Sequence, residues 1–402
     1  MPRRTRILLL IPHLGGGGAE QVIALLAEGL SQMKYDVHLG LVTQVEAPSG
    51  SVPAWVTVHP LGACRVRAGA LKLLRLVGRL QPDVLLSGMA HLNFLVLLLK
   101  PLLPAATRIL VRQNSTVSSS LAQDKLPFYT RFLYRRLYPR ADRILCPSRA
   151  MAADLALWAG LDEQSMVVLP NPLDWAGIQS ALHAPSRWAG PGPNLLAVGR
   201  LAPEKGFDLL LEAMVQVIAC YPAARLTLLG SGPQEEQLKQ LAHRLGLDNV
   251  VSFAGYQQPP YSYYPGATLF VLPSRHEGMP NALMEALAGN LPVVAIPASG
   301  GVEALLEARK NAWLAREVSS PALADALLQA LDAVCDSAAK NRTQHEPSQP
   351  LVIPRSSRTQ CAASRHTVLA DELAMQVDEF DFAHALAAYE QVLDAVCQEP
   401  RP

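Results

Sequence analysis

The feature that most constrains the fold is an alternation of strands and helices that stops once and then starts again. The first series has apolar, strand-like runs at residues 5–13, 36–43, 56–61, 83–87, 107–112 and 143–146, with helical stretches among them. After a segment rich in Pro, Gly and Ala, a second series begins at residue 195. Alternation of this kind predicts parallel sheets covered by helices. We therefore expect an α/β protein of two Rossmann-like domains that face a central cleft, with ligands beyond the carboxyl ends of the strands.

Changes in composition set the expected domain boundaries. We expect a first domain over residues 1–171, a linker over 172–193 and a second domain over 194–336. Residues 337–375 are polar and have no hydrophobic period, which is typical of a loop or a disordered insert. Helical spacing returns within residues 376–402 and predicts a closing helix.

Charge is divided unevenly along the chain. Residues 1–170 hold 19 basic and 10 acidic side chains, whereas the remainder holds 16 and 24. A basic first half favours an anionic partner, such as a membrane surface, a diphosphate or a nucleic acid. We predict the first two and no nucleic acid; a surface imbalance without function is the alternative.

Basic residues of the first half gather in two stretches. The first contains Arg65, Arg67, Lys72, Arg75 and Arg79, and the second contains Lys125, Arg131, Arg135, Arg136, Arg140, Arg143 and Arg149, interleaved with Phe128, Tyr129, Phe132, Tyr134 and Tyr138. Basic side chains mixed with aromatic ones suit an anionic bilayer surface, and ordinary solvated helix faces are the alternative. The apolar runs are shorter than the roughly 20 residues that span a bilayer, and the six cysteines form no C-x-x-C pair. We therefore expect a cytoplasmic protein with free thiols, peripheral on the inner face of the cytoplasmic membrane.

A glycine-rich loop follows the first predicted strand. Gly16 and Gly17 lie at its centre, directly before the first predicted helix. Glycine lets the backbone approach a phosphate or a sugar closely, and a helix N-terminus attracts negative charge. The loop is not a G-x-G-x-x-G motif with a following acid, so a nicotinamide-dependent oxidoreductase is only weakly supported. A plain tight turn is the other alternative.

Two cations follow the first predicted strand of the second domain. Arg200 and Lys205 lie just beyond the end of that strand. A departing diphosphate needs positive charge at such a position. Two cations near a turn are also common on protein surfaces, so this pattern alone is weak.

The most informative pattern surrounds Pro280. Proline suits the first turn of a helix, and the apolar run after it predicts that a helix begins there. The backbone N–H groups of Gly278, Met279 and Asn281 are then expected to face an anion.

Two glutamates flank that helix start. Glu277 precedes it and Glu285 lies about one and a half turns inside it. A carboxylate can accept hydrogen bonds from two sugar hydroxyls at once. The alternative for Glu285 is a buried structural role, because a charge within an apolar run needs a partner. No residues with metal-ligand spacing and no nucleophile motif accompany them, so we predict neither a metal nor a cofactor.

At these residues the chain resembles glycosyltransferase family four, the large family of retaining enzymes with the GT-B fold. Glu277 and Glu285 look like the family's E-x(7)-E motif, and residues 199–206 are similar to its "GRL…EKG" motif. Residues 17–20 resemble its common GGAE start. The likeness covers about residues 1–335 and the closing helix.

The resemblance implies a reaction and a set of site residues. The implied catalytic residues are Glu277, Arg200 and Lys205, and the implied donor-binding residues are Gly16, Gly17, Gly278, Met279, Asn281 and Glu285. Arg200 and Lys205 would hold the donor diphosphate, Glu285 the ribose hydroxyls and Glu277 the transferred sugar. The reaction would be a front-face displacement with retention and without metal, and the last helix would cross back to the first domain.

A finer likeness concerns the acceptor. Residues 87–93 and 112–115 look like a subgroup that builds on polyprenyl-diphosphate-linked sugars, often from a UDP-hexose or UDP-N-acetylhexosamine, in cell-envelope polysaccharide synthesis. The acceptor-side candidates are His91, Arg112 and Asn114. Many relatives carry a sugar-contacting histidine in the region that Arg112 and its neighbours occupy, and His91 is the candidate to replace it.

Some segments depart from the family's patterns. Residues 302–304 and 310–312 differ from the usual sequences near the donor site. A catalytically weakened GT-B scaffold, or a protein that binds a nucleotide-sugar without turnover, is therefore the alternative function. The four charged site residues are all present and favour the enzyme.

Overall fold

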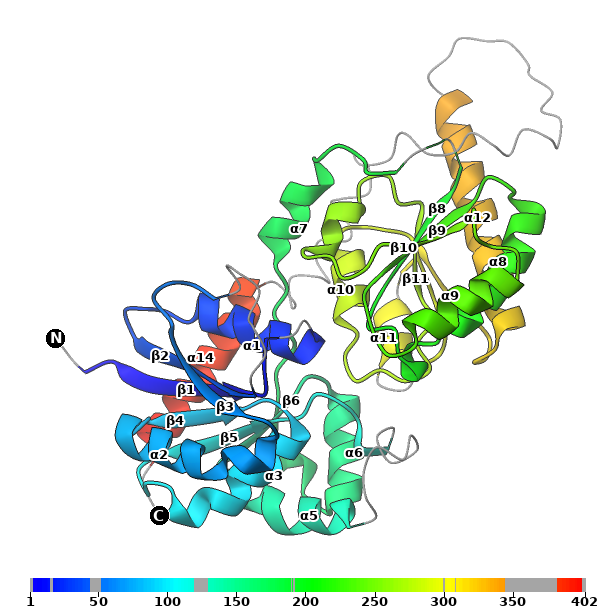
Figure 1. The fold of residues 1–402 in the computed structure, drawn as a ribbon. Coiled ribbons are helices and arrows are strands. Elements are labelled where there is room, and N and C mark those ends of the chain that lie inside the picture. Colours follow the sequence, from blue (N-terminus) through cyan, green and yellow to red (C-terminus); the bar gives the residue numbers. More distant parts are fainter. Residues whose placement is uncertain are drawn as a thin grey trace. The chain divides into compact units, whose positions relative to one another are not determined.

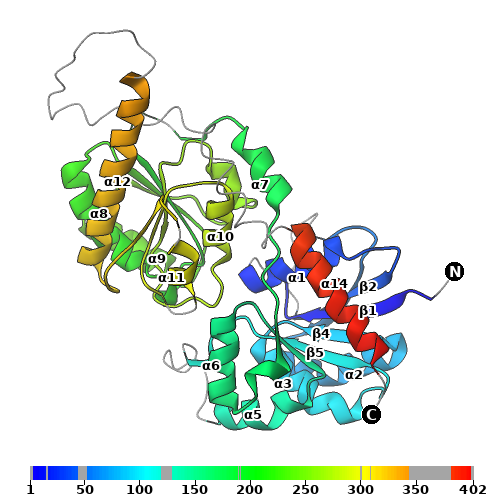
Figure 2. The same ribbon diagram turned by 180° about the vertical axis from the view of Figure 1, so that it is seen from behind.

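The chain divides into two compact units, each built on its own sheet (Figures 1 and 2). Unit 1 comprises Met1–Leu173 and Asp378–Pro402, and unit 2 comprises Asp174–Val377. The computed structural model describes residues 3–14, 17–43, 52–118, 129–188, 190, 192–298, 301–307, 309–343 and 382–399. In both units the sheet is parallel and carries helices, so the prediction of two Rossmann-like α/β domains is confirmed.

Unit 1 contains a seven-stranded parallel sheet in the order β3-β2-β1-β4-β5-β6-β7. Its strands are β1 (Thr5–Ile11), β2 (Tyr35–Thr43), β3 (Thr57–Ala63), β4 (Val84–Ser87), β5 (Arg108–Arg112), β6 (Arg143–Cys146) and β7 (Met166–Val168). The central strands are apolar at nearly every position because helices cover both faces of the sheet. In β1, for example, five successive residues from Ile7 to Ile11 are buried.

Two helix layers cover the two faces of that sheet, each with its own core. One layer is formed by α2 (Ala70–Leu80), α3 (Ala90–Leu99), α5 (Thr130–Leu137) and α6 (Arg149–Ala159), which pack on Leu8, Leu10 and Leu85. The other is formed by α1 (Gly18–Gly29) and α14 (Phe382–Gln398), which pack on Ile7, Leu9 and Leu86. Figures 1 and 2 show the two layers on opposite sides of the strands. Because side chains alternate along β1, Leu8 and Leu9 enter different cores.

The closing helix α14 belongs to unit 1 although it ends the chain. Its Glu390 accepts a hydrogen bond from the backbone of Ser31 at 3.1 Å, and its Asp394 accepts one from Tyr35 Oη at 2.6 Å. Tyr389, also on α14, is buried in the core beneath α1. Polar contacts and apolar burial together hold the end of the chain against its beginning.

Unit 2 contains a six-stranded parallel sheet in the order β10-β9-β8-β11-β12-β13. Its strands are β8 (Asn194–Val198), β9 (Arg225–Leu229), β10 (Val251–Phe253), β11 (Leu269–Leu272), β12 (Val293–Ala295) and β13 (Ala312–Leu314). Its helices are α7 (Trp175–Leu182), α8 (Phe207–Cys220), α9 (Glu235–Arg244), α10 (Asn281–Ala288), α11 (Val302–Leu306) and α12 (Ser320–Thr343). The order of the strands places β8 and β11 side by side, which brings together the loops that follow them.

The structure differs from the sequence-based expectations in three places. The expected linker over residues 172–193 contains helix α7, and α12 continues to Thr343 where a loop was expected from residue 337. The rest of the expected insert, residues 344–375, lies outside the described residues. Tyr134 and Tyr138, which we placed on a membrane-facing surface, are instead buried in the core beneath α5.

The helices were also compared with the requirements of a membrane span. None of the helices in the described part of the chain is both long enough and apolar enough to cross a bilayer.

Candidate active site

Two loops of unit 2 bring predicted site residues together at the carboxyl ends of neighbouring strands. The loop after β8 carries Arg200 and Lys205, and the loop after β11 carries Glu277. Lys205 Nζ donates a hydrogen bond to Glu277 Oε1 at 2.7 Å. The side chain of Glu277 is 7% exposed and that of Lys205 is 27% exposed. Residues 72 positions apart in the sequence thus form one ion pair at the strand ends.

A glycine allows these loops to approach each other so closely. Gly206 has a φ of +65°, in the left-handed region, and a Cβ at this position would lie 2.0 Å from the carbonyl oxygen of Pro273. A larger residue would therefore force the two loops apart. The backbone of Arg275 also donates to the carbonyl of Glu204 at 2.8 Å, which joins the loops through the main chain.

The guanidinium of Arg275 reinforces this contact. It donates to both carboxylate oxygens of Asp208, at 2.7 and 2.6 Å, and to the carbonyl of Pro203 at 2.9 Å. Burial acts to raise the pKa of Asp208, but the hydrogen bonds and the charge of Arg275 outweigh it and lower that pKa. Sequence reasoning did not single out this pair, because its members lie 67 positions apart and Asp208 falls in no motif.

Arg200 occupies a more exposed position than Lys205. Its side chain is 63% exposed and donates to Glu204 Oε1 at 2.6 Å. The Glu204 side chain is only 12% exposed, so an incoming anion would have to compete with this carboxylate for the guanidinium. Both predicted cations are thus paired with carboxylates in the absence of a ligand.

Helix α10 begins directly after the loop that carries Glu277. Gly278, Met279 and Asn281 are half-buried there, and Pro280 occupies the N-cap position, one residue before the first helical position at which the sequence predicted it. Glu285 lies on the second turn of α10 and is 5% exposed. The helix N-terminus directs its partial positive charge toward this loop.

Tyr264 lies close to Glu285 in the interior of unit 2. Burial, followed by the charge of Glu285, raises the pKa of Tyr264 well above its usual value. Its hydroxyl is buried and has no hydrogen-bond partner among the described residues. Glu285 is therefore held in a poorly hydrated setting beside Tyr264.

In unit 1 the glycine loop is described only in part. Gly16 lies outside the described residues. Gly17 is the N-cap of α1, and a Cβ at this position would lie 2.2 Å from Oε2 of Glu20. The absence of a side chain at Gly17 therefore allows the Glu20 carboxylate to fold back over the start of the helix.

His91 lies at the same edge of the sheet, in the first turn of α3 after β4. It is an exposed residue, yet partial burial of its ring and the nearby His13 lower the pKa of His91. The ring is therefore neutral at pH 7 and can exchange hydrogen bonds with a sugar. We did not single out His13 from the sequence, although its place after the first strand was a usable signal.

The other two acceptor-side candidates are less accessible. Asn114 donates a hydrogen bond to the carbonyl of Gly88, and its Oδ1 is buried without a partner in the described part of the chain. Arg112 is 1% exposed and donates to Tyr389 Oη at 3.0 Å and to Asn171 Oδ1. The burial of Arg112 does not support its prediction as an acceptor contact.

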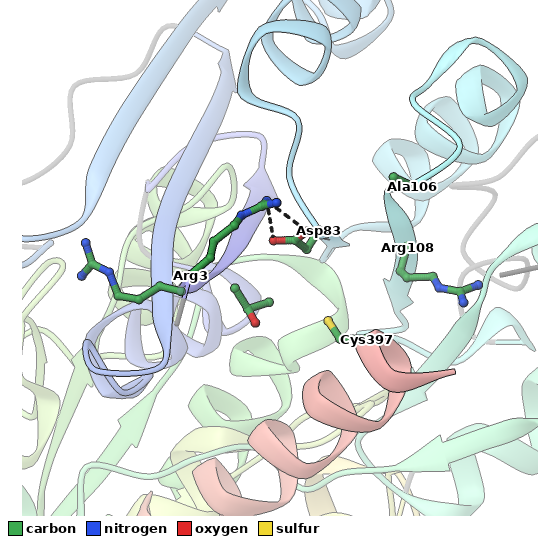
Figure 3. Close-up of a pocket in the computed structure, with 7 residues that line it drawn as sticks. Arg3, Asp83, Ala106, Arg108 and Cys397 are labelled. Carbon is green, nitrogen blue, oxygen red and sulfur yellow. Dashed lines mark hydrogen bonds and ion pairs between the residues drawn. The ribbon is translucent and has the colours of Figure 1, made fainter. Parts of the chain in front are cut away.

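A cavity of about 180 Å³ lies at the opposite, amino edge of the unit 1 sheet (Figure 3). It is lined by Arg3, Arg4, Thr5, Asp83, Ala106, Arg108 and Cys397. Figure 3 shows Arg3 joined to Asp83, and the nearer of their contacts is 3.0 Å. None of the predicted site residues lines this cavity, so we do not assign the reaction to it.

The contacts of Arg275 lead to a prediction. In Arg275→Met the loop that carries Glu277 loses its bonds to Asp208 and Pro203, so the Lys205–Glu277 geometry should loosen. We expect kcat to fall by about tenfold with little change in KM for the donor, and Arg275→Lys to recover part of the loss. Steady-state kinetics, with a donor identified as described below, would measure this.

Lys239→Met is the matched control, because it removes another ion pair of unit 2, between Lys239 and Glu235 at 2.7 Å. If Arg275→Met lowers only the melting temperature and leaves kcat unchanged, the role of Arg275 is purely structural.

Two segments of the chain match known protein families. Residues 16–176 match the family described as Glycosyltransferase Family 4, and residues 192–333 match the family described as Glycosyl transferases group 1. An uncharacterized glycosyltransferase of Haemophilus influenzae is 38% identical over 124 residues, which cover 31% of this chain and 35% of that protein. The match thus spans about a third of that relative's length.

Other relatives are similar over more of the chain. The N-acetylgalactosamine-N,N'-diacetylbacillosaminyl-diphospho-undecaprenol 4-alpha-N-acetylgalactosaminyltransferase of Campylobacter jejuni is 29% identical over 74% of this chain and 82% of its own length. Among solved structures, Anabaena HepE in complex with UDP-glucose aligns with a TM-score of 0.69 and 18% identity, over 98% of this chain and 100% of that one. The structural likeness identifies the two Rossmann-like units as the GT-B fold.

Proposed function

Because the chain belongs to the family 4 and group 1 glycosyltransferases and has the GT-B fold, we propose that it transfers a sugar from a UDP-sugar to a lipid-linked glycan. The transferred sugar is a hexose or an N-acetylhexosamine, and the product serves cell-envelope polysaccharide synthesis. The observation that carries the proposal is the Lys205–Glu277 pair at the strand ends of unit 2. A cation that can bind a diphosphate lies beside a carboxylate that can accept sugar hydroxyls, and this supports the proposal.

The choice of donor is supported by the relatives and by the charged residues of the site. The Anabaena structure is a complex with UDP-glucose, and the Campylobacter enzyme is named as an N-acetylgalactosaminyltransferase. In this chain the diphosphate binds Arg200, Lys205 and the N-terminus of α10. Glu285 accepts hydrogen bonds from the two ribose hydroxyls, and Glu277 contacts the transferred sugar.

The reaction follows from these contacts. The bond between the anomeric carbon and the donor phosphate breaks, while an acceptor hydroxyl attacks the same face of the sugar. Because attack and departure occur on the same face, the anomeric configuration is retained, and the hydroxyl proton passes to the departing phosphate oxygen. Arg200 and Lys205 stabilise the negative charge that develops on the diphosphate, and the reaction uses neither a metal nor a cofactor.

The acceptor is a sugar carried on a polyprenyl diphosphate. The name of the Campylobacter relative describes such an acceptor, and His91 is exposed at the acceptor-side edge of unit 1. An acceptor of this kind resides in a bilayer, so the enzyme works peripherally at the cytoplasmic face of the membrane.

A binding and product assay tests this function. UDP should raise the melting temperature more than GDP does, because a ligand that binds only the folded state stabilises it. With a series of UDP-sugars and a polyprenyl-diphosphate-linked sugar, one donor should give an α-linked product from its α-linked sugar. An inverted product, or no nucleotide binding, would contradict the proposal. Tight binding of a UDP-sugar without turnover would favour the non-catalytic alternative.

A further inference from the structure

The two helix layers of unit 1 carry opposite charges. Helices α2, α3, α5 and α6 together hold one acidic residue, Asp154, and seven basic ones: Lys72, Arg75, Arg79, Arg131, Arg135, Arg136 and Arg149. Helices α1 and α14, on the other face, hold no Lys or Arg and four acidic residues: Glu20, Glu28, Glu390 and Asp394. The basic excess of the first half of the chain is thus concentrated on the outer face of one layer, here called the basic layer (α2, α3, α5 and α6).

Helix α5 directs its basic residues away from the sheet. Its exposed residues are Arg131, Phe132, Arg135 and Arg136. They form one stripe because helical residues three to four apart share a face. Tyr134 and Leu137, on the inner face, are buried. This helix is therefore amphipathic in an unusual sense: its outer face mixes arginines with an aromatic ring and has no acidic residue.

The arginines of this stripe rest on aromatic rings. Arg131 lies over the ring of Trp158 at 5.4 Å, and Arg136 lies over that of Phe132 at 5.7 Å. In the described part of the chain these two guanidinium groups contact aromatic rings, in positions where an ion pair would have a carboxylate. The positive charge therefore remains available to an external anion.

Large apolar side chains are exposed on the same layer. Four of them lie on its helices and are between 57 and 75% exposed: Leu71, Leu98, Phe132 and Leu157; Leu102, which is 70% exposed, lies in the short helical turn directly after α3. Leaving such side chains in water is unfavourable relative to burying them. Their spread across α2, α3, α5 and α6 shows that the whole layer combines apolar and basic character.

We propose that the basic layer is the surface through which unit 1 binds an anionic phospholipid bilayer. Phe132 and Leu157 enter the headgroup region, and the arginines of α5 bind lipid phosphates. This inference deepens the proposed function and rests on it for the biological source of the bilayer, since a polyprenyl-linked acceptor is membrane-resident. It also explains why the acidic layer, formed by α1 and α14, lies on the opposite face.

The apolar residues decide between a bilayer and a nucleic acid. A polynucleotide would engage the arginines, and its bases would stack on aromatic rings. The exposed side chains of Leu98, Leu102 and Leu157 offer no ring for stacking, whereas a bilayer accepts them directly. Nucleic-acid binding is therefore an outcome that the test must exclude.

The position of His91 fits this orientation. His91 is exposed on α3, a helix of the basic layer, at the carboxyl edge of the sheet. A sugar diphosphate that stands on the bilayer surface would reach unit 1 at this edge. The same docking that binds the membrane would thus present the acceptor to its candidate residue.

Charge reversal on α5 tests whether its arginines contribute to the binding of anionic vesicles. Wild-type protein should bind vesicles of phosphatidylcholine with phosphatidylglycerol, and not vesicles of phosphatidylcholine alone. Arg135→Glu with Arg136→Glu should weaken this binding at least about 25-fold, because each basic residue near an anionic surface strengthens binding about fivefold. The control is Arg244→Glu with Arg316→Glu, which makes the same change of charge at exposed positions of unit 2 and should lower binding much less.

A separate variant tests whether an exposed apolar side chain enters the bilayer. Phe132→Ser should weaken vesicle binding and make the remaining binding more sensitive to salt, since only the charged contacts persist. Met33→Ser is the control, because Met33 is 86% exposed but lies outside the basic layer. Equal effects of the two variants would refute insertion at Phe132.

Two further results would overturn the proposal. One is equal loss of binding in the α5 variant and its unit 2 control, or equal binding to neutral vesicles. The other is salt-dependent binding of a polynucleotide without vesicle binding, which would assign the surface to nucleic acid. UDP binding, measured on the same samples, separates this proposal from the proposed function. Loss of vesicle binding with intact UDP binding would contradict only the membrane surface. Loss of UDP binding with intact vesicle binding would contradict only the proposed function.

Discussion

Replacing Glu285 with alanine is expected to weaken UDP binding by roughly 1.5–3 kcal/mol, or about 10- to 150-fold. The carboxylate lies on the second turn of α10, 5% exposed, where water competes poorly for its oxygens. Two ribose hydroxyls that donate to a charged acceptor in such a setting form strong hydrogen bonds. Isothermal titration with UDP alone measures the effect, because the ribose is present whether or not a sugar is attached.

Replacing Glu277 with alanine should have the opposite pattern. Lys205 is paired with Glu277 at 2.7 Å, so this carboxylate and a bound diphosphate would compete for the same cation. Removing it should leave UDP affinity unchanged or raise it. Turnover should nevertheless fall by about 100-fold or more, because the contact with the transferred sugar matters most in the transition state.

Two further variants make the contrast between the glutamates interpretable. Glu285→Gln keeps the volume of the side chain and should be milder than alanine for folding, yet still weaken UDP. Glu235→Ala removes a partly exposed glutamate that pairs with Lys239 in the same unit and should change neither measurement. If both Glu285 variants unfold while Glu277→Ala behaves as described, Glu285 is a structural buried carboxylate. Wild-type behaviour of both Glu277→Ala and Glu285→Ala would refute the site.

The donor side of the site followed from the sequence because parallel strands end at a common edge. Lys205 follows the end of β8 by seven residues and Glu277 follows the end of β11 by five, and the pairing of β8 with β11 makes the two loops neighbours. Pro280 marked the start of α10 for a local reason, its suitability for a helix N-terminus. These signals are local in the sequence. Because the carboxyl ends of parallel strands share one edge of the sheet, residues in different loops are brought together there.

Other features depend on packing between distant parts of the chain, so they were not predicted from the sequence. Arg275 reads as an ordinary loop residue, and only the folded chain brings it to Asp208. Helix α7 lies in a stretch with loop-like composition, although Asp174, which accepts a hydrogen bond from Gly177 N at 2.9 Å, was an available N-cap signal. The aromatic residues of α5 looked alike in sequence, and the burial of Tyr134 beside the exposure of Phe132 depends on which face meets the sheet.

Arg112 is the clearest case of a residue whose role changed. It ends β5, where the strand-end rule predicts a ligand contact. The fold instead places Asn171 and the closing helix over it, so that its guanidinium is 1% exposed and bound to Tyr389 Oη at 3.0 Å and to Asn171. Both partners come from distant parts of the chain, 277 and 59 positions away. The sequence therefore contained no local sign of this network.

Arg112→Ala is accordingly expected to destabilise unit 1 by about 3–5 kcal/mol, the size of a large-to-small core substitution. It opens a cavity beneath α14 and leaves Tyr389 Oη and Asn171 Oδ1 buried without their donor. Tyr389→Phe, which removes one hydrogen bond to a charged group, should cost about 1.5–3 kcal/mol. Thermal or denaturant unfolding measures both, with UDP binding by unit 2 as the internal reference.

Arg3→Ala is the control, because it breaks an ion pair of the same unit at a side chain that is 67% exposed, and it should cost less than about 1 kcal/mol. If Arg112→Ala is instead as stable as the wild type and loses only transfer to the acceptor, then the guanidinium reaches the substrate after all and the acceptor-side prediction is the correct one.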